Sequence, residues 1–144
     1  MLYTASSFIR FYNELEDEVI GFYEKLLEDQ RFSEYHDVFS SFIEESNRHK
    51  DLITRSYREV ITDAMEAAFP LRSLDEGDYE VKTGSVKEQA VSDVLNDAIQ
   101  VEGACRQFCL DACDSLSGLL ADVPEEFTLV AEKKSLRIEK LKSL

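Results

Sequence analysis

The stretch LEDEVIGFYEKLLED, from Leu15 to Asp29, decides the fold that we expect for this chain. Its apolar residues recur at steps of three and four and include Val19, Phe22 and Tyr23. That spacing is typical of an amphipathic helix with one buried face. Glu16 falls on the same stripe, although a carboxylate is rarely buried without a partner. The stretch therefore predicts a helix that carries an acid toward the interior of the protein.

The same helical periodicity continues along nearly the whole chain. We expect Ser33 to be the N-cap of a second helix, which ends before Pro70. The sequence from Ser85 to Glu88 has the form of a capping box and predicts the start of a third helix. Asp122 is the expected N-cap of a fourth, with a proline in its first turn. The predicted helices span residues 5–29, 33–68, 85–118 and 123–142.

The connection over residues 70–84 is polar, contains two glycines and lacks a period. It separates two helical pairs, residues 5–68 and 85–142, within a single domain over residues 1–144. Short loops within each pair favour antiparallel neighbours. The expected fold is therefore all-α, an antiparallel four-helix bundle with one long crossover.

Composition narrows the classes of partner. The 144 residues carry a net charge of −14, which repels nucleic-acid phosphates and anionic membranes. No apolar run approaches the ~20 residues of a membrane span, and the N-terminus becomes acidic too early for a signal peptide. The three cysteines lie in one helical stretch and do not form a disulfide framework. We expect a cytoplasmic protein that binds neither nucleic acid nor membrane.

The two halves of the chain align with each other. A shift of 86 places Glu16 on Glu102, and a shift of 88 places Ser46 on Lys134 and His49 on Arg137. Two amphipathic helices always align somewhere, so the apolar matches carry little weight. The two carboxylates are better evidence, because they lie at equivalent inward positions and the partner helices carry polar residues at their matching positions. This pattern indicates that these polar residues belong to one site.

In these features the chain resembles the ferritin-like superfamily, and within it the rubrerythrin-type di-iron proteins. Tyr23, seven residues after Glu16 and preceded by Phe22, is the most specific feature of this resemblance. The stretches that carry it are LEDEVIGFYEKLLED (15–29), SSFIEESNRHKDLI (40–53), AIQVEGACRQFC (98–109) and VAEKKSLRIEKL (130–141). The resemblance implies a ferritin-like fold in which each half supplies one Glu and one Glu-x-x-His to two iron atoms.

Transferred residue by residue, that site is degenerate. Glu16 and Glu102 stand at the first-helix carboxylates of each half, and His49 stands at one histidine. Ser46 and Lys134, however, replace the bridging glutamates, and Arg137 replaces the second histidine. Cationic side chains do not ligate a cation. We therefore expect no metal, and we predict that Glu16 or Glu102 pairs with Lys134 or Arg137.

The alternative for the two cations is that Lys134 and Arg137 extend out of the end of the bundle. We expect His49 to bond a carboxylate or Tyr23. Glu45, four residues before His49, could instead join it in a mononuclear iron or zinc site with Glu16 or Glu102 nearby; otherwise Glu45 is solvated.

A run of cysteines follows one helix face at steps of four. Cys105, Cys109 and Cys113 are either small buried residues or soft ligands and redox groups. The Cys-x-x-Cys pairs of a rubredoxin-like module are absent from the sequence, so retained peroxide chemistry would need electrons from another protein.

Two functions remain open. The first is a non-catalytic binding or structural module, with apolar residues such as Leu52, Ile61 and Leu95 beside the main stripes favouring a homodimer. The alternative is a metal-binding oxidoreductase or iron-handling protein with an altered mononuclear or di-metal site. The substitutions at positions 46, 134 and 137 favour the first. The sequence does not predict a protein partner.

Overall fold

The computed structural model describes residues 1–60, 71–120 and 122–144. Its main elements are four long helices: α1 (Ala5–Leu27), α2 (His36–Val60), α4 (Val91–Leu116) and α5 (Val123–Lys142). Three 3-10 turns accompany them: η1 (Gln30–Tyr35), η2 (Glu76–Tyr79) and η3 (Val86–Glu88). These residues form no β-strand, and only an isolated bridge joins Leu2 to Leu74. The all-helical fold with four helices that the periodicity predicts is confirmed.

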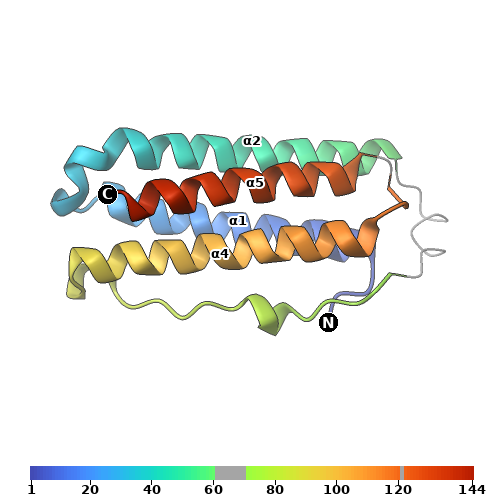
Figure 1. Cartoon of the computed structure of the whole chain (residues 1–144), viewed down its shortest axis with the longest axis horizontal. Helices are drawn as coiled ribbons and strands as arrows, with labels where there is room; N and C mark the ends of the chain where they lie inside the picture. Colours follow the sequence, from blue (N-terminus) through green and yellow to red (C-terminus); the bar gives the residue numbers. More distant parts are fainter. Residues whose placement is uncertain (61–70, 121) are drawn as a thin grey trace.

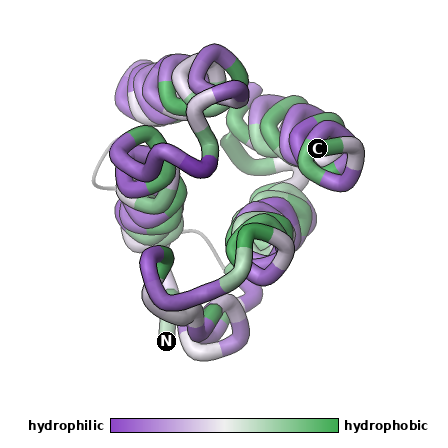
Figure 2. Tube along the Cα trace, turned by 90° about the vertical axis from the view of Figure 1, so that its left-hand side faces the viewer, coloured by the Kyte–Doolittle hydropathy of each residue, from purple (hydrophilic) through white to green (hydrophobic). Residues whose placement is uncertain are grey.

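The four helices pack around a common interior (Figure 2), and we call this arrangement the bundle. Helix α1 contacts α2 and α4, and α5 contacts α4 and α2. The chain follows α1, turns at η1 and returns along α2 (Figure 1). The described part of the crossover, residues 71–90, then runs along the bundle, so that α4 begins at the end where η1 lies. The long crossover thus passes beside the helices rather than between them.

Local capping explains where α1 starts. The Thr4 side chain accepts a hydrogen bond from the Ser7 backbone N–H, and the Ser7 hydroxyl accepts one from the Thr4 N–H, each at 3.1 Å. This reciprocal pair satisfies two N–H groups that the first turn of a helix leaves free. Helix α1 ends at Leu27, two residues before the predicted end.

Two predicted helix starts are wrong. Ser33 lies inside η1, and α2 begins at His36, because Asp29 caps the turn earlier by accepting a hydrogen bond from the Arg31 N–H. The Ser85–Glu88 stretch forms η3 without a side-chain cap, and α4 begins only at Val91. Arg31 holds this segment instead, since its guanidinium donates to the carbonyl oxygens of Val86 and Gln89 at 2.7 and 2.6 Å.

The bounds of the last helix agree with the prediction, but the cap differs. Helix α5 spans Val123–Lys142 with Pro124 in its first turn. Asp122 precedes it with helical backbone angles, and its side chain makes no capping hydrogen bond. The predicted end of the second helix at residue 68 and the stop at Pro70 lie outside the described residues, as does Ile61.

The core combines aromatic packing with a buried polar centre. The ring of Phe108 contacts those of Phe8, Phe11, Tyr79 and Phe127 at centroid distances of 5.1–6.3 Å. The buried polar residues of the described chain are Glu16, Ser46, His49, Glu102, Lys134 and Arg137. Along the described ranges, no helix has the length and apolar character needed to cross a membrane.

Candidate functional site

All six sequence-predicted site positions meet in the middle of the bundle. Helix α1 supplies Glu16, α4 supplies Glu102, α5 supplies Lys134 and Arg137, and α2 supplies Ser46 and His49. Each of these residues lies on the inward stripe of its helix, which is why the fold brings them together. We call Glu16, Glu102, Lys134 and Arg137 the buried charge cluster. Lys134 is 0% exposed and Arg137 is 2% exposed, so neither extends out of the bundle end.

Lys134 lies between the two carboxylates. Its Nζ is 2.6 Å from Oε1 of Glu16 and 2.8 Å from Oε1 of Glu102. Both distances are those of strong charge-assisted hydrogen bonds. The prediction that at least one of the two glutamates pairs with Lys134 or Arg137 is therefore met, and the Lys134 ammonium contacts a carboxylate from each half of the chain.

Arg137 uses its whole guanidinium group. Nη1 donates to Oε2 of Glu102 at 3.1 Å and to Oγ of Ser46 at 2.8 Å. Nη2 donates to the backbone carbonyl of Phe42 at 2.9 Å, and Nε donates to Oε1 of Glu45 at 3.0 Å. The guanidinium carbon also lies 5.1 Å from the centre of the Phe42 ring. Arg137 thus ties α5 to both α2 and α4.

Two tyrosines donate further hydrogen bonds to the glutamates. The Tyr12 hydroxyl donates to Oε2 of Glu16 at 2.6 Å, and the Tyr23 hydroxyl donates to Oε2 of Glu102 at 2.7 Å. Tyr23, in the first half of the chain, therefore donates to the carboxylate from the second half. All four carboxylate oxygens of the pair accept at least one hydrogen bond from a buried donor.

The pKa shifts follow from this arrangement. Burial alone would raise the pKa of Glu102, but Lys134 and Arg137, together with the hydrogen bonds from Lys134 and Tyr23, more than offset it and lower the pKa. Burial would lower the pKa of Lys134, yet Glu102 and Glu16 raise it above its ordinary value. Burial raises the pKa of Tyr23, and the negative charge of Glu102 and the hydrogen bond between Tyr23 and Glu102 raise it further. The carboxylate of Glu102 stays ionised and Lys134 stays protonated near neutral pH.

Glu45 and His49 differ from their expected roles. Glu45 is not simply solvated, because its side chain is 25% exposed and pairs with Arg137. His49 is 7% exposed, and its Nδ1 is buried without a hydrogen-bond partner among the described residues. This nitrogen therefore bonds neither a carboxylate nor Tyr23, contrary to expectation, and the Tyr23 hydroxyl donates to Glu102 instead.

Burial lowers the pKa of His49. Glu45 and Glu16 oppose that effect, whereas Arg137 and Lys134 add to it. The neutral imidazole is therefore the form that the folded protein favours.

The cysteines pack against the core as free thiols. Cys105 and Cys109 are buried, and the Sγ of half-buried Cys113 lies 3.1 Å from Oγ1 of Thr128. Burial raises the pKa of Cys109, and the neighbouring Cys105 raises it further. A reactive thiolate needs the opposite shift. This favours the packing interpretation over the redox or metal-ligating one.

The residues present do not fit the di-iron centre that the resemblance implies. The ammonium of Lys134 lies within hydrogen-bond distance of both carboxylates, where a metal would need their free lone pairs. Ser46 and Glu45 are likewise bonded to Arg137. Among the described residues, no group of three or more His, Cys, Asp or Glu is placed to hold a metal ion.

Sequence reasoning missed two partners in the site. Tyr12 is one helical turn before Glu16 on the same stripe, so the spacing of four carried a signal for its hydrogen bond. The carbonyl of Phe42, which accepts from Arg137, carried no such signal, because it belongs to the backbone of another helix.

Comparison with known proteins returns no match: no family model, no curated protein and no solved structure is similar to this chain at a significant level.

Proposed function

We propose that this protein is a ferritin-like, rubrerythrin-type bundle whose di-iron site is degenerate, and that it serves as a non-catalytic binding or structural module. In this proposal the helix pairs are antiparallel and related by the internal repeat. The buried cations take the electrostatic place of the metal ions. The protein is then cytoplasmic and needs neither iron nor an electron donor.

A single observation carries the proposal: the Lys134 ammonium bridges Glu16 and Glu102 within 2.8 Å. Two buried carboxylates without compensation would each cost several kcal/mol. In a di-iron site the metal ions balance the negative charge, whereas here the cationic side chains of Lys134 and Arg137 balance it. The cluster therefore supports a stabilising role in the core, where each of its charged groups already pairs with another member of the cluster.

The alternative, a metal-binding oxidoreductase or iron-handling protein, rests on the unpartnered Nδ1 of His49. A free imidazole nitrogen is a good ligand for iron or zinc. Its closest acidic neighbour in sequence on this helix face, Glu45, is already paired with Arg137. A mononuclear site would have to break that pair, which favours the non-catalytic proposal.

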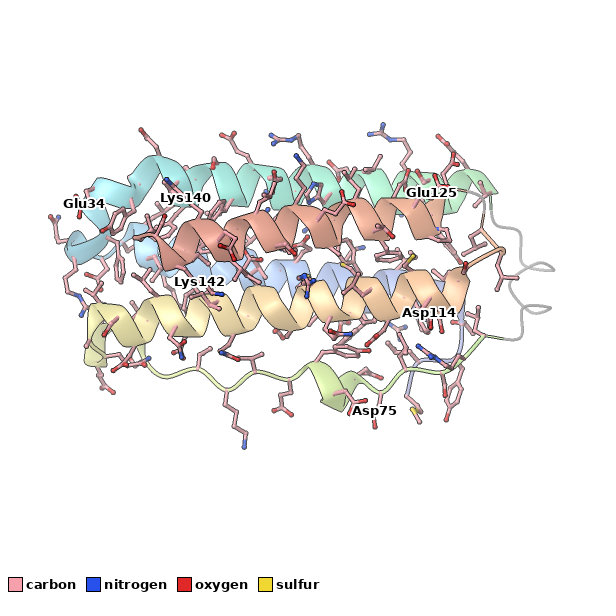
Figure 3. All side chains as sticks on the ribbon, viewed as in Figure 1. Glu34, Asp75, Asp114, Glu125, Lys140 and Lys142 are labelled. Atoms are coloured by element: carbon pink, nitrogen blue, oxygen red, sulfur yellow. The ribbon has the colours of Figure 1, made fainter. Side chains whose placement is uncertain are left out.

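Self-association completes the proposal, and the outer face of α5 is the surface we assign to it. Leu129 and Leu136 are large apolar residues that are 41% and 63% exposed, seven positions apart on this face. Glu125 and Lys140 lie toward opposite ends of the same helix (Figure 3). Two copies of α5 packed antiparallel would therefore pair leucine with leucine and acid with base. Leu52 and Leu95 are half-buried and offer less surface.

Metal content tests the proposal directly. The protein is purified aerobically from iron-supplemented cells without a metal-affinity tag, and its iron and zinc are measured by elemental analysis. We expect far less than one metal ion per chain. The variant Ser46→Glu/Lys134→Glu/Arg137→His, prepared in parallel, is the control that these conditions load a metal site. Stoichiometric metal in the unmodified protein, lost on His49→Ala or Glu16→Ala, would overturn the proposal in favour of the metal-binding alternative.

A further inference from the structure

A groove lies between α1 and the crossover, and α4 contributes one residue to it. Its volume is about 670 Å³. Leu15 and Phe22 of α1 and Val101 of α4 form an apolar floor, and Tyr79 and Val81 of the crossover form the outer wall. Small-molecule sites in proteins are typically clefts of roughly 300–1,000 Å³ with mostly apolar walls and a few polar groups. The groove has the size of such a site, and its lining combines apolar residues with charged ones.

Gly21 lies in the middle of α1 and opens onto this groove. A Cβ added at this position would meet no atom within 4 Å. Packing therefore does not require a glycine here, although glycine in a helix interior costs about 1 kcal/mol relative to alanine. What the missing side chain provides is open space directly above the helix backbone, and that space is part of the groove.

The charged groups that line the groove are mostly acidic. They are Glu18 and Lys25 from α1, and Glu76 and Glu80 from the crossover. The N-terminal ammonium already pairs with Glu76 at 3.0 Å. Neither Glu18 nor Glu80 forms an ion pair with any residue that the structure describes. Partial burial raises the pKa of Glu18, and the negative charges of Glu14 and Glu80 raise it further.

We propose that this groove binds a small organic cation, a protonated amine with an apolar body. The ammonium lies between Glu18 and Glu80, and the apolar body lies over Gly21 against Leu15 and Phe22. A carboxylate or phosphate ligand would meet the two glutamates with like charge. A metal ion would find an apolar floor and, among the described residues, no group of three ligating side chains. The inference goes beyond the proposed function and does not depend on it, because no residue of the buried charge cluster lines the groove.

Three matched eight-carbon probes test the charge and the apolar parts separately. Octylamine, octanol and octanoate are titrated into the protein at pH 7 and followed by calorimetry and by amide chemical shifts. We expect saturable binding of octylamine, about tenfold tighter than octanol, and no binding of octanoate. The amide shifts are expected along α1 around Gly21 and in the crossover. Equal binding of all three probes, or no saturable binding of the amine, would overturn the proposal.

Two sets of variants assign the site. Gly21→Leu fills the open space and improves helix propensity, so the variant is expected to fold and to lose amine binding at least tenfold. Gly21→Ala is its control, which retains binding and raises the melting temperature.

Glu18→Gln and Glu80→Gln are expected to reduce the preference for octylamine over octanol, whereas Glu24→Gln, on the same helix but outside the groove, is expected to leave it unchanged. Amine binding that survives both Gly21→Leu and the Glu18→Gln/Glu80→Gln pair would refute the assignment. Metal content is read independently, so failure here leaves the proposed function standing, and the converse also holds.

Discussion

Nζ of Lys134 lies 2.6 Å from Oε1 of Glu16, which joins the last helix to the first across 118 positions of sequence. Both side chains are wholly buried. A buried ion pair of this kind contributes modestly when intact, because both charges lose their hydration, but the loss of one partner leaves the other charge stranded. The stability of this fold therefore depends on keeping the cluster balanced.

Lys134→Met is expected to lower the free energy of unfolding by about 3–5 kcal/mol, because Glu16 loses the one cationic hydrogen-bond partner that it has among the described residues. Urea unfolding followed by circular dichroism measures the change. Lys133→Met, the neighbouring half-buried lysine, is the control and is expected to change stability by less than about 1 kcal/mol. Adding Glu16→Gln to Lys134→Met should recover part of the loss. Equal effects at positions 133 and 134 would contradict the bridging role.

The two site tyrosines should differ in importance. Tyr12→Phe leaves Oε2 of Glu16 without its donor, whereas Tyr23→Phe leaves Oε2 of Glu102 bonded to Arg137. A buried charged acceptor left unsatisfied costs about 1–3 kcal/mol or more. We expect Tyr12→Phe to destabilise the protein by more than Tyr23→Phe, as measured by urea unfolding of the two variants side by side. The reverse order would show that Arg137 does not satisfy Glu102.

Introducing the ligand pattern of rubrerythrin-type di-iron proteins should make the stability of the fold depend on metal. In Ser46→Glu/Lys134→Glu/Arg137→His, four buried carboxylates replace two balanced pairs, so the metal-free variant is expected to melt below the unmodified protein. Ferrous or zinc ion should then raise its melting temperature, by a stabilisation of about 2.7 kcal/mol when the free metal is 100 times its Kd. The same variant with Gln in place of Glu at positions 46 and 134 is the control. No metal-induced shift relative to that control would argue against a ferritin-like arrangement of these positions.

The burial of His49 predicts that the free energy of unfolding decreases in mild acid. Its pKa in the folded protein is lowered, chiefly by burial, so protonation favours the unfolded chain. The contribution of the neutral imidazole is fully present above the unfolded pKa of about 6.5 and is lost as the pH falls below it, by up to about 1.4 kcal/mol per pH unit. His49→Phe should flatten the fall in stability between about pH 7 and pH 5.

The control for this pH dependence is the only other histidine in the sequence, His36, whose side chain is 63% exposed. His36→Phe should retain the pH dependence of the unmodified protein. If His49→Phe and the unmodified protein lose stability in parallel, His49 is not the titrating group.

Association through α5 has a specific signature in light scattering. Leu129→Glu/Leu136→Glu should convert a dimer to a monomer, because it places four acids in an apolar seam of two exposed leucines per copy. Glu125→Lys should weaken the dimer by opposing Lys140 of the other copy, and adding Lys140→Glu should restore it. Leu52→Glu, on α2, is the control and should leave the dimer intact. An unmodified protein that is monomeric at tens of micromolar would contradict the self-association proposal.

The sequence by itself determined the helices and which residues of each helix lie on its buried face. Apolar steps of three and four depend only on local geometry, so they place Glu16, Glu102, Lys134 and Arg137 on buried stripes. Charge balance then predicts that acids and bases meet, because a buried charge requires a partner. Helix starts were less predictable. Ser33 and Ser85 have the chemistry of N-caps, but Asp29 and the Arg31 bonds to the crossover fix the chain differently.

Only the tertiary structure decided which side chains form hydrogen bonds and ion pairs with one another. Lys134 bridges both glutamates, Tyr23 reaches Glu102 rather than Glu16, and Arg137 takes Glu45 and a carbonyl of α2. These choices depend on how closely the helices pack against one another, which the periodicity of a single helix does not encode. His49 shows the consequence: its position was predictable, but its Nδ1 has no hydrogen-bond partner among the described residues, and the Tyr23 hydroxyl donates to Glu102 instead. A side chain's direction follows from its own helix, whereas its partner is set by how the four helices pack.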